Sequence, residues 1–337
     1  MTRIFLTHNR SALHHDYGDR ALELLSSLGS VSFHDSDADT TADDIIRQAR
    51  DCEILVSFRV PPIDARLMQS LPHLTAICRV AVDIRNIDLE YANQQGILVT
   101  RATPGFDASV AEWIIGVMIS LARHLHIAAS SYHNGQVPVA LMGRELRAAT
   151  LGIIGYGTIG RYLARLARAF GMRIVVNEPH SAVQEAGDIQ QGSMDQLLHQ
   201  SDFVVCLVPA TEATTHLING SDFQKMKRSA YFINASSADL VNEADLLHAL
   251  DNEVIAGCAM DVGSAKDQAP SLALARHPRI LATPRVGGLT AEAAAYQAMG
   301  SVEQIRALIG GQVPEHSVNA LYALRAQRRF RLALPQD

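Results

Sequence analysis

Residues 151–160 are LGIIGYGTIG, an apolar run that leads into the pattern Gly155-x-Gly157-x-x-Gly160. The residues that follow, RYLARLARAFG, favour a helix, so the glycines are expected in a turn between a strand and a helix. In such a turn Gly155 permits the tight bend, Gly157 lets backbone approach a pyrophosphate, and Gly160 lets helix and strand pack closely. A glycine cluster that merely packs in some other βα turn is the alternative.

The next apolar run, RIVVNE at 173–178, ends in an acid, Glu178. A carboxylate at this place accepts hydrogen bonds from the adenosine ribose and repels a 2′-phosphate, and no Arg follows it. The predicted cofactor is therefore NAD. The residues expected to hold it at the turn and at the helix N-terminus, where N–H groups and the dipole favour phosphate, are Gly155, Gly157, Thr158, Ile159, Gly160 and Glu178.

Outward from this turn, short apolar runs alternate with helical patterns, which predicts βαβ units on parallel sheets. The strands expected before it are RIFLTH (3–8), EILVSF (53–58), LTAICRV (74–80) and ILVT (97–100). The strands expected from it onward are LGIIG (151–155), RIVVNE (173–178), FVVCLV (203–208), AYFINA (230–235), VIAGCAMDV (254–262) and RILAT (279–283). Interior runs lack polar alternation, as strands buried on both faces do.

Helical patterns complete the prediction. TADDIIRQAR (41–50) carries a Thr cap and acids in its first turn. A long amphipathic helix is predicted over 108–125, and SYHNGQVPVALMG (131–143) is predicted to be a connection. The segment from Thr290 to about Ile309 is predicted helical, and the basic end RAQRRFRLALPQD is expected to fray.

Composition limits the classes of protein that remain. The 337 residues suggest two domains, and 48% apolar with 19% charged residues predicts packed cores. A net charge of −6 without a basic stripe argues against nucleic acid, and the N-terminus lacks a signal peptide's apolar stretch. No apolar run is long enough to span a membrane. The four cysteines form no CxxC pair and the histidines show no metal-ligand spacing, so we expect a cytoplasmic protein without a metal site.

By its motifs, the chain over roughly residues 50–310 resembles the D-isomer-specific 2-hydroxyacid dehydrogenases. The stretches that carry the resemblance are AVDIRNIDLEYANQQGILVTRATPGFDASVAEW, GYGTIGRYLARLARAFGMRIVVNEP, QLLHQSDFVVCLVPATEATTHLINGSDFQKMKRSAYFINAS, IAGCAMDV and TPRVGGLTAE. The resemblance implies an α/β protein with two doubly wound parallel sheets. A flavodoxin-like outer domain (1–103 and 289–337) would receive an inserted Rossmann domain (104–288), with NAD in the cleft and a homodimer formed through the Rossmann domain and the helix 108–125.

The resemblance also implies where the chemistry should lie, and there this chain departs from the family. Members carry an Arg in NxxRG, a Glu shortly after the DV pair, and a proton-donating His in TPHxGG. Here Ser237 takes the Arg position, Lys266 takes the Glu position (or Asp267, if the loop is one residue longer), and Arg285 takes the His position. The family's Gly-rich carboxylate loop is replaced by Ala81, Val82 and Asp83, whose acid would repel a substrate carboxylate if it faced the cleft.

The residues around the nicotinamide match the family better. Those implied by the resemblance to contact the cofactor are Pro209, Thr214, Asn234, Asp261, Gly287 and Gly288. More of the family's cofactor-contacting positions than of its catalytic positions are therefore matched, so the prediction of cofactor binding has more support than the prediction of turnover.

Arg285 cannot act as the missing acid, because a guanidinium stays protonated with a pKa above about 12. It could instead bind a carboxylate bidentately or stabilise a developing alkoxide. Lys266 is the first candidate for the proton donor, since a lysine pKa falls on desolvation or beside another cation; a solvated loop lysine is the alternative. Ser237 and Tyr296 are weaker candidates.

Three functions remain open from the sequence. The first is an NAD-dependent oxidoreductase for a hydroxy or oxo substrate with a rewired proton relay. The second is an NAD(H)-binding sensor or partner protein with little catalysis. The third is an ordinary 2-oxoacid reductase, of glyoxylate or hydroxypyruvate type, that tolerates the substitutions. In every case the expected partner is a small-molecule substrate.

Overall fold

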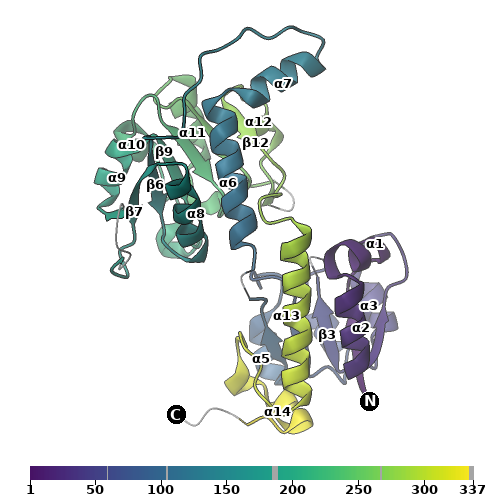
Figure 1. Ribbon diagram of the computed structural model, residues 1–337. Coiled ribbons are helices and arrows are strands. Elements are labelled where there is room, and N and C mark those ends of the chain that lie inside the picture. Colours follow the sequence, from purple (N-terminus) through teal and green to yellow (C-terminus); the bar gives the residue numbers. More distant parts are fainter. Residues whose placement is uncertain (59, 104, 184–188, 266–267, 334–337) are drawn as a thin grey trace. The chain divides into compact units, whose positions relative to one another are not determined.

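The computed structural model describes residues 1–58, 60–103, 105–183, 189–265 and 268–333. The chain divides into two compact units (Figure 1). Unit 1 comprises Met1–Gly105 and Ala291–Asp337, and unit 2 comprises Phe106–Thr290. The chain thus leaves unit 1 after its fifth strand and returns to it for the C-terminal helices.

Unit 1 is built on a parallel five-stranded sheet with the strand order β2-β1-β3-β4-β5, the order of flavodoxin-like folds. Its strands are β1 (Thr2–Leu6), β2 (Gly29–Phe33), β3 (Ile54–Ser57), β4 (Ala76–Arg79) and β5 (Leu98–Thr100). Its helices are α1 (Arg10–Ala12), η1 (Leu13–Tyr17), α2 (Asp19–Leu28), α3 (Ala42–Gln48), α4 (Ala65–Gln69), α5 (Leu89–Gln95), α13 (Ala291–Ile309), η5 (Ala320–Tyr322) and α14 (Leu324–Phe330).

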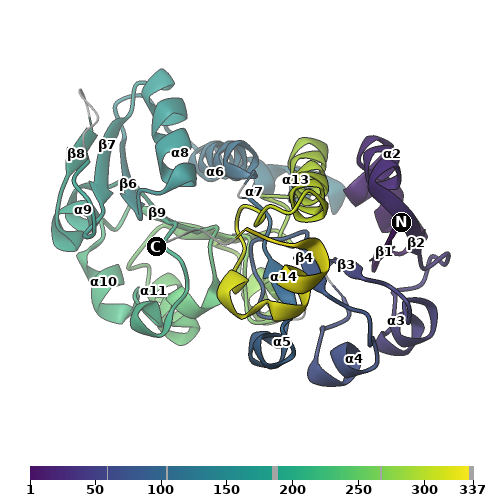
Figure 2. The ribbon, with the colours of Figure 1, turned by 90° about the horizontal axis from the view of Figure 1, so that it is seen from below.

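The two faces of this sheet are covered by helices from different parts of the chain. Successive strand residues point to opposite faces, so Ile4 and Leu6 pack in a core with α2, α13 and α14, whereas Phe5 packs with α3, α4 and α5. Figure 2 shows α2 on one side of strands β1 to β4 and α3 and α4 on the other. The C-terminal segment is therefore part of the core of the N-terminal unit.

Unit 2 is built on a parallel seven-stranded sheet with the strand order β12-β11-β10-β9-β6-β7-β8. Its strands are β6 (Thr150–Ile154), β7 (Arg173–Asn177), β8 (Ile189–Gln191), β9 (Phe203–Cys206), β10 (Tyr231–Asn234), β11 (Gly257–Met260) and β12 (Ile280–Ala282). Its helices are α6 (Asp107–Ala122), α7 (Leu125–His133), α8 (Thr158–Ala169), α9 (Met194–Gln200), η2 (Glu212–Thr214), α10 (Gly220–Lys225), η3 (Ala238–Leu240), α11 (Glu243–Asp251) and α12 (Leu272–Ala275).

The strand order of unit 2 reverses at β6, as in a Rossmann fold. Leu151 and Ile153 face a core with α6 and α8, which pack on each other, whereas Ile154 faces a core with α9, α10 and α11. Strands β6, β9 and β11 are buried along their whole length, which explains their unbroken apolar sequence. The predicted fold class, two doubly wound parallel sheets, is confirmed.

The helix predicted over 108–125 is shorter than expected. Helix α6 ends at Ala122, and α7 begins at Leu125 after a bend of 74°. His124, between them, has a φ of 54°, and a left-handed residue cannot continue a right-handed helix. The carbonyl of Ala122 accepts a hydrogen bond from the N–H of Arg144 (2.9 Å) instead, so the end of α6 is set by a residue distant in sequence.

The described part of the basic C-terminal stretch, residues 325–333, includes most of a helix where fraying was expected, and residues 334–337 lie outside the described residues. Helix α14 buries Ala326 and Phe330, and Arg329 pairs with Glu53 of unit 1. Strands β2 and β8 were not predicted, because GSVSF and IQQ are partly exposed edge strands with polar side chains. Among the described residues, no single helix has both the length and the apolar character to span a membrane; only the bent pair α6 and α7 reaches that length together.

Candidate active site

The glycine turn between β6 and α8 has the geometry that its sequence predicts. Gly155 has a φ of +90°, and a Cβ there would stand 3.0 Å from the backbone N of Val208. A Cβ on Gly160 would stand 2.7 Å from the carbonyl oxygen of Gly155, so helix and turn approach each other closely. Around Gly157, in contrast, the structure leaves open space for a Cβ, and therefore also for a ligand group.

The N-terminus of α8 opens next to this turn. Gly157 is its N-cap and provides no side-chain cap for the first helical N–H groups, so Thr158, Ile159 and Gly160 begin the helix with the N–H groups available to an anion. A surface hollow here has Asp107, Thr158, Arg161 and Arg165 among its lining residues. The turn and helix end together can hold a pyrophosphate.

Glu178 follows β7 and lies beside the same turn. Its Oε2 accepts a hydrogen bond from the N–H of Tyr156 (3.0 Å), and its Oε1 accepts one from the N–H of His180 (3.1 Å). The Tyr156 N–H is the largest cause that lowers the pKa of Glu178 below its ordinary value. The carboxylate is thus ionised at neutral pH and only half-buried, as a ribose-binding acid must be.

The residues expected near the nicotinamide lie in the loops after β9 and β10. Thr214 donates from its Oγ1 to the carbonyl of Pro209 (2.8 Å), which closes the loop after β9 on itself. Buried Asn234, at the end of β10, accepts from Ser236 N–H (3.1 Å) and donates to the Ser237 carbonyl (2.8 Å). Both loops are therefore held in shape by the side chains that the sequence singled out.

Ser237, at the position of the family's Arg, is the N-cap of the short helix η3. Its hydroxyl donates to a carboxylate oxygen of Asp239 (3.2 Å) and accepts from the Asp239 N–H (3.4 Å) at the start of η3. A hydroxyl in this arrangement offers no fixed positive charge, so it cannot replace a guanidinium as a carboxylate clamp.

Asp261 organises the loop that carries Arg285. The loop contributes three donors to its carboxylate: the Thr283 hydroxyl (2.5 Å), the Val286 N–H (2.9 Å) and the Gly287 N–H (2.8 Å). Burial raises the pKa of Asp261, although these hydrogen bonds and Arg285 act in the opposite direction. A Cβ on Gly287 would stand 2.8 Å from the carboxylate, so this approach requires glycine.

Arg285 stands on this loop in a backbone conformation that is unusual for a non-glycine residue. Its φ is 57°, and its N–H donates to the carbonyl of Asp261 (3.0 Å). The side chain is exposed, and its Nη1 donates to the Oε1 of Gln268. Gln268 is a partner that the sequence did not suggest, because nothing in a loop sequence marks a contact with the next loop. Gly288 packs beside Phe106 and Val110, whereas Lys266 and Asp267 lie outside the described residues.

In unit 1, Ala81, Val82 and Asp83 follow β4, and Asp83 is not an isolated acid. The Arg85 guanidinium forms a bidentate ion pair with its carboxylate, at 3.1 Å from Nε and 2.9 Å from Nη2. The negative charge that the sequence places in this loop is thus paired with a cation two residues later. The carbonyl of Asp83 also accepts from Nε of buried Arg79 (3.1 Å), which ties the loop to the end of the sheet.

Two further side chains of unit 1 are of residue types that can transfer protons. Tyr296, on α13, is half exposed, and its ring lies against Gly105. His8, which the sequence did not single out, is fully buried after β1 and stacks on Phe58 with ring centroids 4.4 Å apart. Burial, with a contribution from Arg79, lowers the pKa of His8 to about 3, so His8 is a neutral imidazole, not a protonated imidazolium, near neutral pH.

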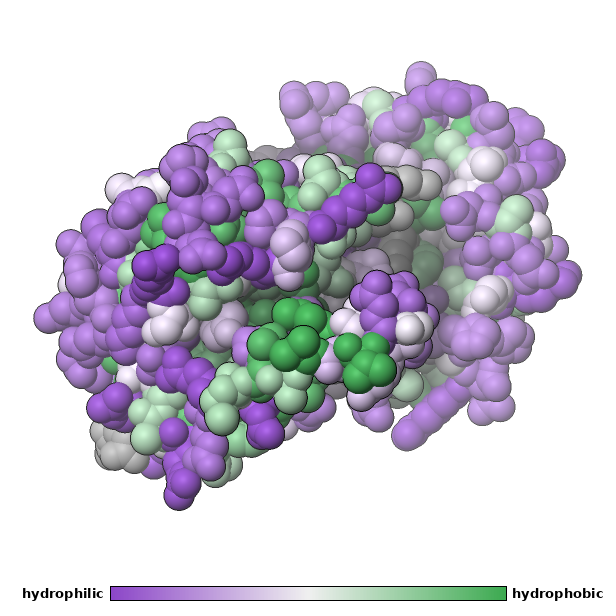
Figure 3. All heavy atoms as spheres, turned by 90° about the horizontal axis from the view of Figure 1, so that it is seen from above, coloured by the Kyte–Doolittle hydropathy of each residue, from purple (hydrophilic) through white to green (hydrophobic). Residues whose placement is uncertain are grey.

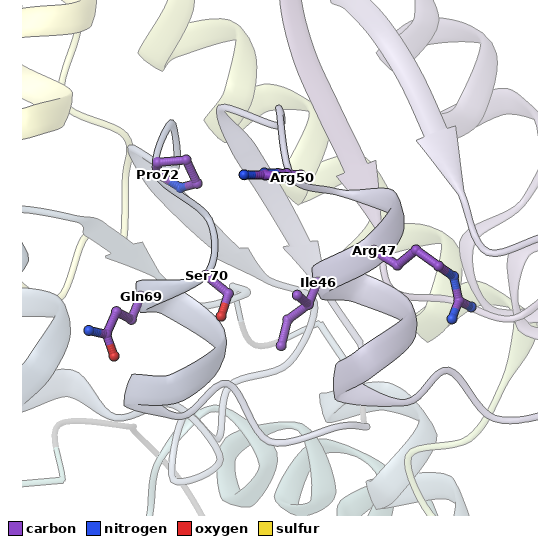
Figure 4. Close-up of a pocket in the computed structure, with 6 residues that line it drawn as sticks. All are labelled: Ile46, Arg47, Arg50, Gln69, Ser70 and Pro72. Carbon is purple, nitrogen blue, oxygen red and sulfur yellow. The ribbon is translucent and has the colours of Figure 1, made fainter.

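A separate hollow lies on the surface of unit 1 at α3 and α4 (Figure 4). Ile46 extends into it from α3 and Ser70 from the C-cap of α4, whereas Arg47 points away. The remaining described lining residues are Arg50, Gln69 and Pro72. None of these belongs to the predicted site, and the hollow has no part in the chemistry considered below.

Comparison with known proteins identifies the family. Residues 115–287, about half of the chain, match the model of the D-isomer specific 2-hydroxyacid dehydrogenase NAD-binding domain. The chain belongs to this family. It is accordingly an oxidoreductase whose cofactor is NAD, and the matched segment contains both the glycine turn and Glu178.

Individual relatives agree with this assignment. A glyoxylate reductase of Korarchaeum cryptofilum is 32% identical over 284 residues, which cover 82% of this chain and 85% of the relative. A hydroxypyruvate reductase of Thermotoga maritima is 32% identical over 267 residues, covering 78% and 87%. The structure of the pyruvate reductase of Chlamydomonas reinhardtii superposes with a TM-score of 0.80 at 25% identity, covering 91% of this chain and 96% of that one. The dehydrogenase relatives thus span both units.

Proposed function

We propose that this dehydrogenase reduces a small 2-oxo carboxylate with NADH, using Arg285 as a fixed cation in place of the family's proton-donating histidine. The observation that carries the proposal is the loop on which Arg285 stands. Asp261 binds Thr283, Val286 and Gly287 there, so the loop keeps an ordered shape around the changed side chain. An ordered loop at the altered position supports a site with changed chemistry rather than a site that has lost its activity.

Arg285 would stabilise negative charge on the substrate rather than transfer a proton to it. Hydride addition to a 2-oxo carbon places negative charge on the oxygen, and a guanidinium beside it stabilises that alkoxide or binds the carboxylate bidentately. The left-handed backbone of Arg285 costs of order 1–3 kcal/mol for a non-glycine residue.

The test is a steady-state assay of NADH oxidation with glyoxylate, hydroxypyruvate and pyruvate, beside neutral ketones of the same size. Replacing Arg285 with Ala should lower kcat/KM for the oxo acids by about 10²- to 10³-fold, the usual effect of removing one transition-state donor. Arg285→Lys keeps the positive charge without the planar guanidinium, so its kcat/KM should lie between those of the wild type and of Arg285→Ala. NADH binding without turnover on either panel would instead support a sensor or partner protein. Unchanged rates in Arg285→Ala would refute the role of Arg285.

The proton for the alkoxide must come from another group, and we propose Lys266. An ammonium near a guanidinium has a lowered pKa and can act as a general acid closer to neutrality. Lys266→Ala should slow reduction of the oxo acid and remove one limb of its pH profile. If both rate and pH profile stay unchanged, with Ser237→Ala and Tyr296→Phe as comparison variants, the relay through Lys266 is wrong.

We also propose that the enzyme is a homodimer and works in the cytoplasm. Helix α7 has no buried residue, and the apolar side chains exposed on it and on the segment after it are Leu125, Ile127, Tyr132, Val137, Val139, Leu141 and Met142. Figure 3 looks onto this end of the molecule, where apolar residues gather. A patch of this kind is typical of a protein interface. The four cysteines are buried free thiols, as expected in a reducing compartment.

Light scattering tests the dimer. The wild type should have twice the chain mass of 36.6 kDa, and Tyr132→Asp combined with Val139→Asp should yield the monomer mass. Leu272→Asp, a change at another exposed apolar side chain, is the control and should leave the mass unchanged. A wild-type species of monomer mass would contradict the proposal.

A further inference from the structure

His8 lies at the switch point of the sheet in unit 1. The strand order β2-β1-β3-β4-β5 reverses at β1, so the switch point falls between β1 and β3. In doubly wound sheets, ligands bind outside the carboxyl ends of the strands at such a point. His8 follows shortly after β1 and Phe58 directly after β3, and their rings stack with centroids 4.4 Å apart and planes at 22°. An aromatic pair therefore joins the two strand ends.

The imidazole of His8 is held by its ring faces and edges. It is 0% exposed, and among the described residues neither of its ring nitrogens has a hydrogen-bond partner. Tyr17 adds a second aromatic contact, edge-on at 5.1 Å. Burial and nearby Arg79 lower the pKa of His8 to about 3, so the ring is neutral under ordinary assay conditions. What His8 contributes is thus an uncharged aromatic ring.

Phe58 connects this stack to the loop after β4. Its backbone carbonyl accepts a hydrogen bond from Nη1 of Arg79, the last residue of β4. Nε of Arg79 donates in turn to the carbonyl of Asp83 (3.1 Å). Arg79 is 7% exposed, and hydrogen bonds in such a low-dielectric place are stronger than at the surface. A displacement of Phe58 is therefore passed to Asp83 through a buried guanidinium.

We propose that His8 is a positioning residue that sets the loop 81–83, which stands where the family binds the substrate carboxylate. The ring of His8 holds Phe58, and the Phe58 carbonyl holds Arg79, which binds the loop. The proposal rests on an oxo acid as the substrate. It gives a residue outside the loop a part in the affinity for that acid, and it requires no contact between His8 and the substrate.

The first test separates substrate affinity from stability. His8→Ala should raise KM for the oxo acid about tenfold with little change in kcat, because a displaced loop loses about one hydrogen bond to ground state and transition state alike. His8→Phe restores an uncharged ring and should return KM to near the wild-type value. Phe5→Ala is the matched control, since Phe5 is also 0% exposed but packs with α3, α4 and α5. It should lower the melting temperature and leave KM unchanged.

A double-mutant cycle tests the path through Arg79. Arg79→Lys keeps the positive charge but loses the planar fork that binds two carbonyls at once. If His8 acts through Arg79, KM of the double variant should be no higher than that of the worse single variant, because coupled residues are not additive. Fold-changes that multiply in the double variant would mean that His8 acts by another route, which contradicts the proposal.

Amide hydrogen exchange gives a readout that needs no turnover. The N–H groups of Val80 and Arg85 are hydrogen-bonded at 3.0 Å and 2.9 Å, so their protection reports on the loop between them. Exchange of residues 80–85, taken relative to that of strand β5 in the same protein, should rise in His8→Ala but not in Phe5→Ala. If the wild type reduces no oxo acid, the proposed function has failed, and the exchange result alone decides whether His8 sets the loop.

Three results would overturn the proposal. An unchanged KM in a folded His8→Ala variant would mean that the loop does not depend on the ring. A KM as high in Phe5→Ala as in His8→Ala would mean that loss of stability alone explains the effect. A KM as high in His8→Phe as in His8→Ala would mean that stacking is not what holds the loop. If His8→Ala does not fold, His8→Leu, which fills the site without an aromatic face, takes its place in each comparison.

Discussion

The most direct test of the architecture around Arg285 is the replacement of Asp261 with Asn. The side chain is 6% exposed and binds three donors from the loop 283–287. If the amide oxygen takes the place of Oδ1, the Thr283 and Val286 donors keep an acceptor. The amide NH₂ then faces the Gly287 N–H at the position where the carboxylate oxygen stood 2.8 Å away. Two donors would meet there, and the Gly287 N–H would lose its partner.

The expected cost follows from these contacts. A buried N–H left without an acceptor costs about 1–3 kcal/mol. The two surviving hydrogen bonds change from charge-assisted to neutral and lose roughly half their strength, about 0.5–1 kcal/mol each. Burial opposes part of this loss, because it raises the pKa of Asp261 and so disfavours the charge that Asn removes. We expect unit 2 to lose about 2–4 kcal/mol of unfolding free energy.

The single tryptophan makes the measurement specific. Trp113 lies on α6, and its ring is within 3.5 Å of where a Cβ on Gly287 would stand. Urea unfolding followed by Trp113 fluorescence therefore reports on unit 2 and on this loop, with the free energy obtained by linear extrapolation. Thr283→Val, which removes one donor and keeps the carboxylate, is the control and should cost about 1 kcal/mol.

A loss below about 0.5 kcal/mol in Asp261→Asn, the size of an ordinary surface change, would refute the reasoning. It would mean that the loop holds its shape without the three bonds to Asp261. A loss of the expected size should be accompanied by weaker NADH binding, because the same loop includes Gly287 and Gly288.

Three further outcomes are expected. Gly155→Ala should abolish measurable NADH binding, because a left-handed φ of +90° and a Cβ 3.0 Å from the backbone N of Val208 both disfavour alanine in this turn. Fluorescence titration with NADH checks this, with Gly116→Ala as the control because a Cβ there meets nothing within 4 Å. Normal NADH binding by Gly155→Ala would contradict the prediction. Burial raises the pKa of Asp202, but the Thr150 N–H and nearby cations outweigh it and leave the pKa below the ordinary 3.8. The ionised carboxylate therefore stabilises the folded state above about pH 4, and this contribution is lost as pH falls further. Asp202→Asn should destabilise unit 2 at pH 7 and flatten the dependence of its unfolding free energy on acid pH, and parallel curves for variant and wild type would refute the assignment. Arg329→Ala should free α14 from Glu53 and speed proteolysis of the C-terminus, and unchanged digestion would show that packing of Phe330 alone holds the helix.

Much of the fold could be predicted because its signals are local. The runs at β3, β4, β6 and β9 are short and wholly apolar, and in the structure each is buried along its length. Thr41 before α3 forms the capping box that its sequence indicates, with Asp44 in the first turn. The edge strands β2 and β8 escaped prediction for the opposite reason, since an exposed edge needs no apolar pattern.

The candidate site divides in the same way. The glycine turn and Glu178 lie in one continuous βαβ unit, so a short stretch of sequence contains both partners. The pairing of Asp83 with Arg85 was missed although the two are close in sequence, because an ion pair depends on which way a loop directs its side chains. The contact of Arg285 with Gln268, and the burial of His8 against Phe58, depend on which loops the fold brings together.

By itself, the sequence determined two parallel α/β sheets, a nucleotide-binding turn and the absence of a histidine where the family has one, because these depend on residue type and short-range spacing. Only the tertiary structure decided that α6 ends at Ala122, that the C-terminal helices complete the N-terminal core, and that the acid in the loop after β4 is neutralised. These features come from contacts between residues far apart in the chain or from loop conformation, and neither leaves a periodic signal along the sequence.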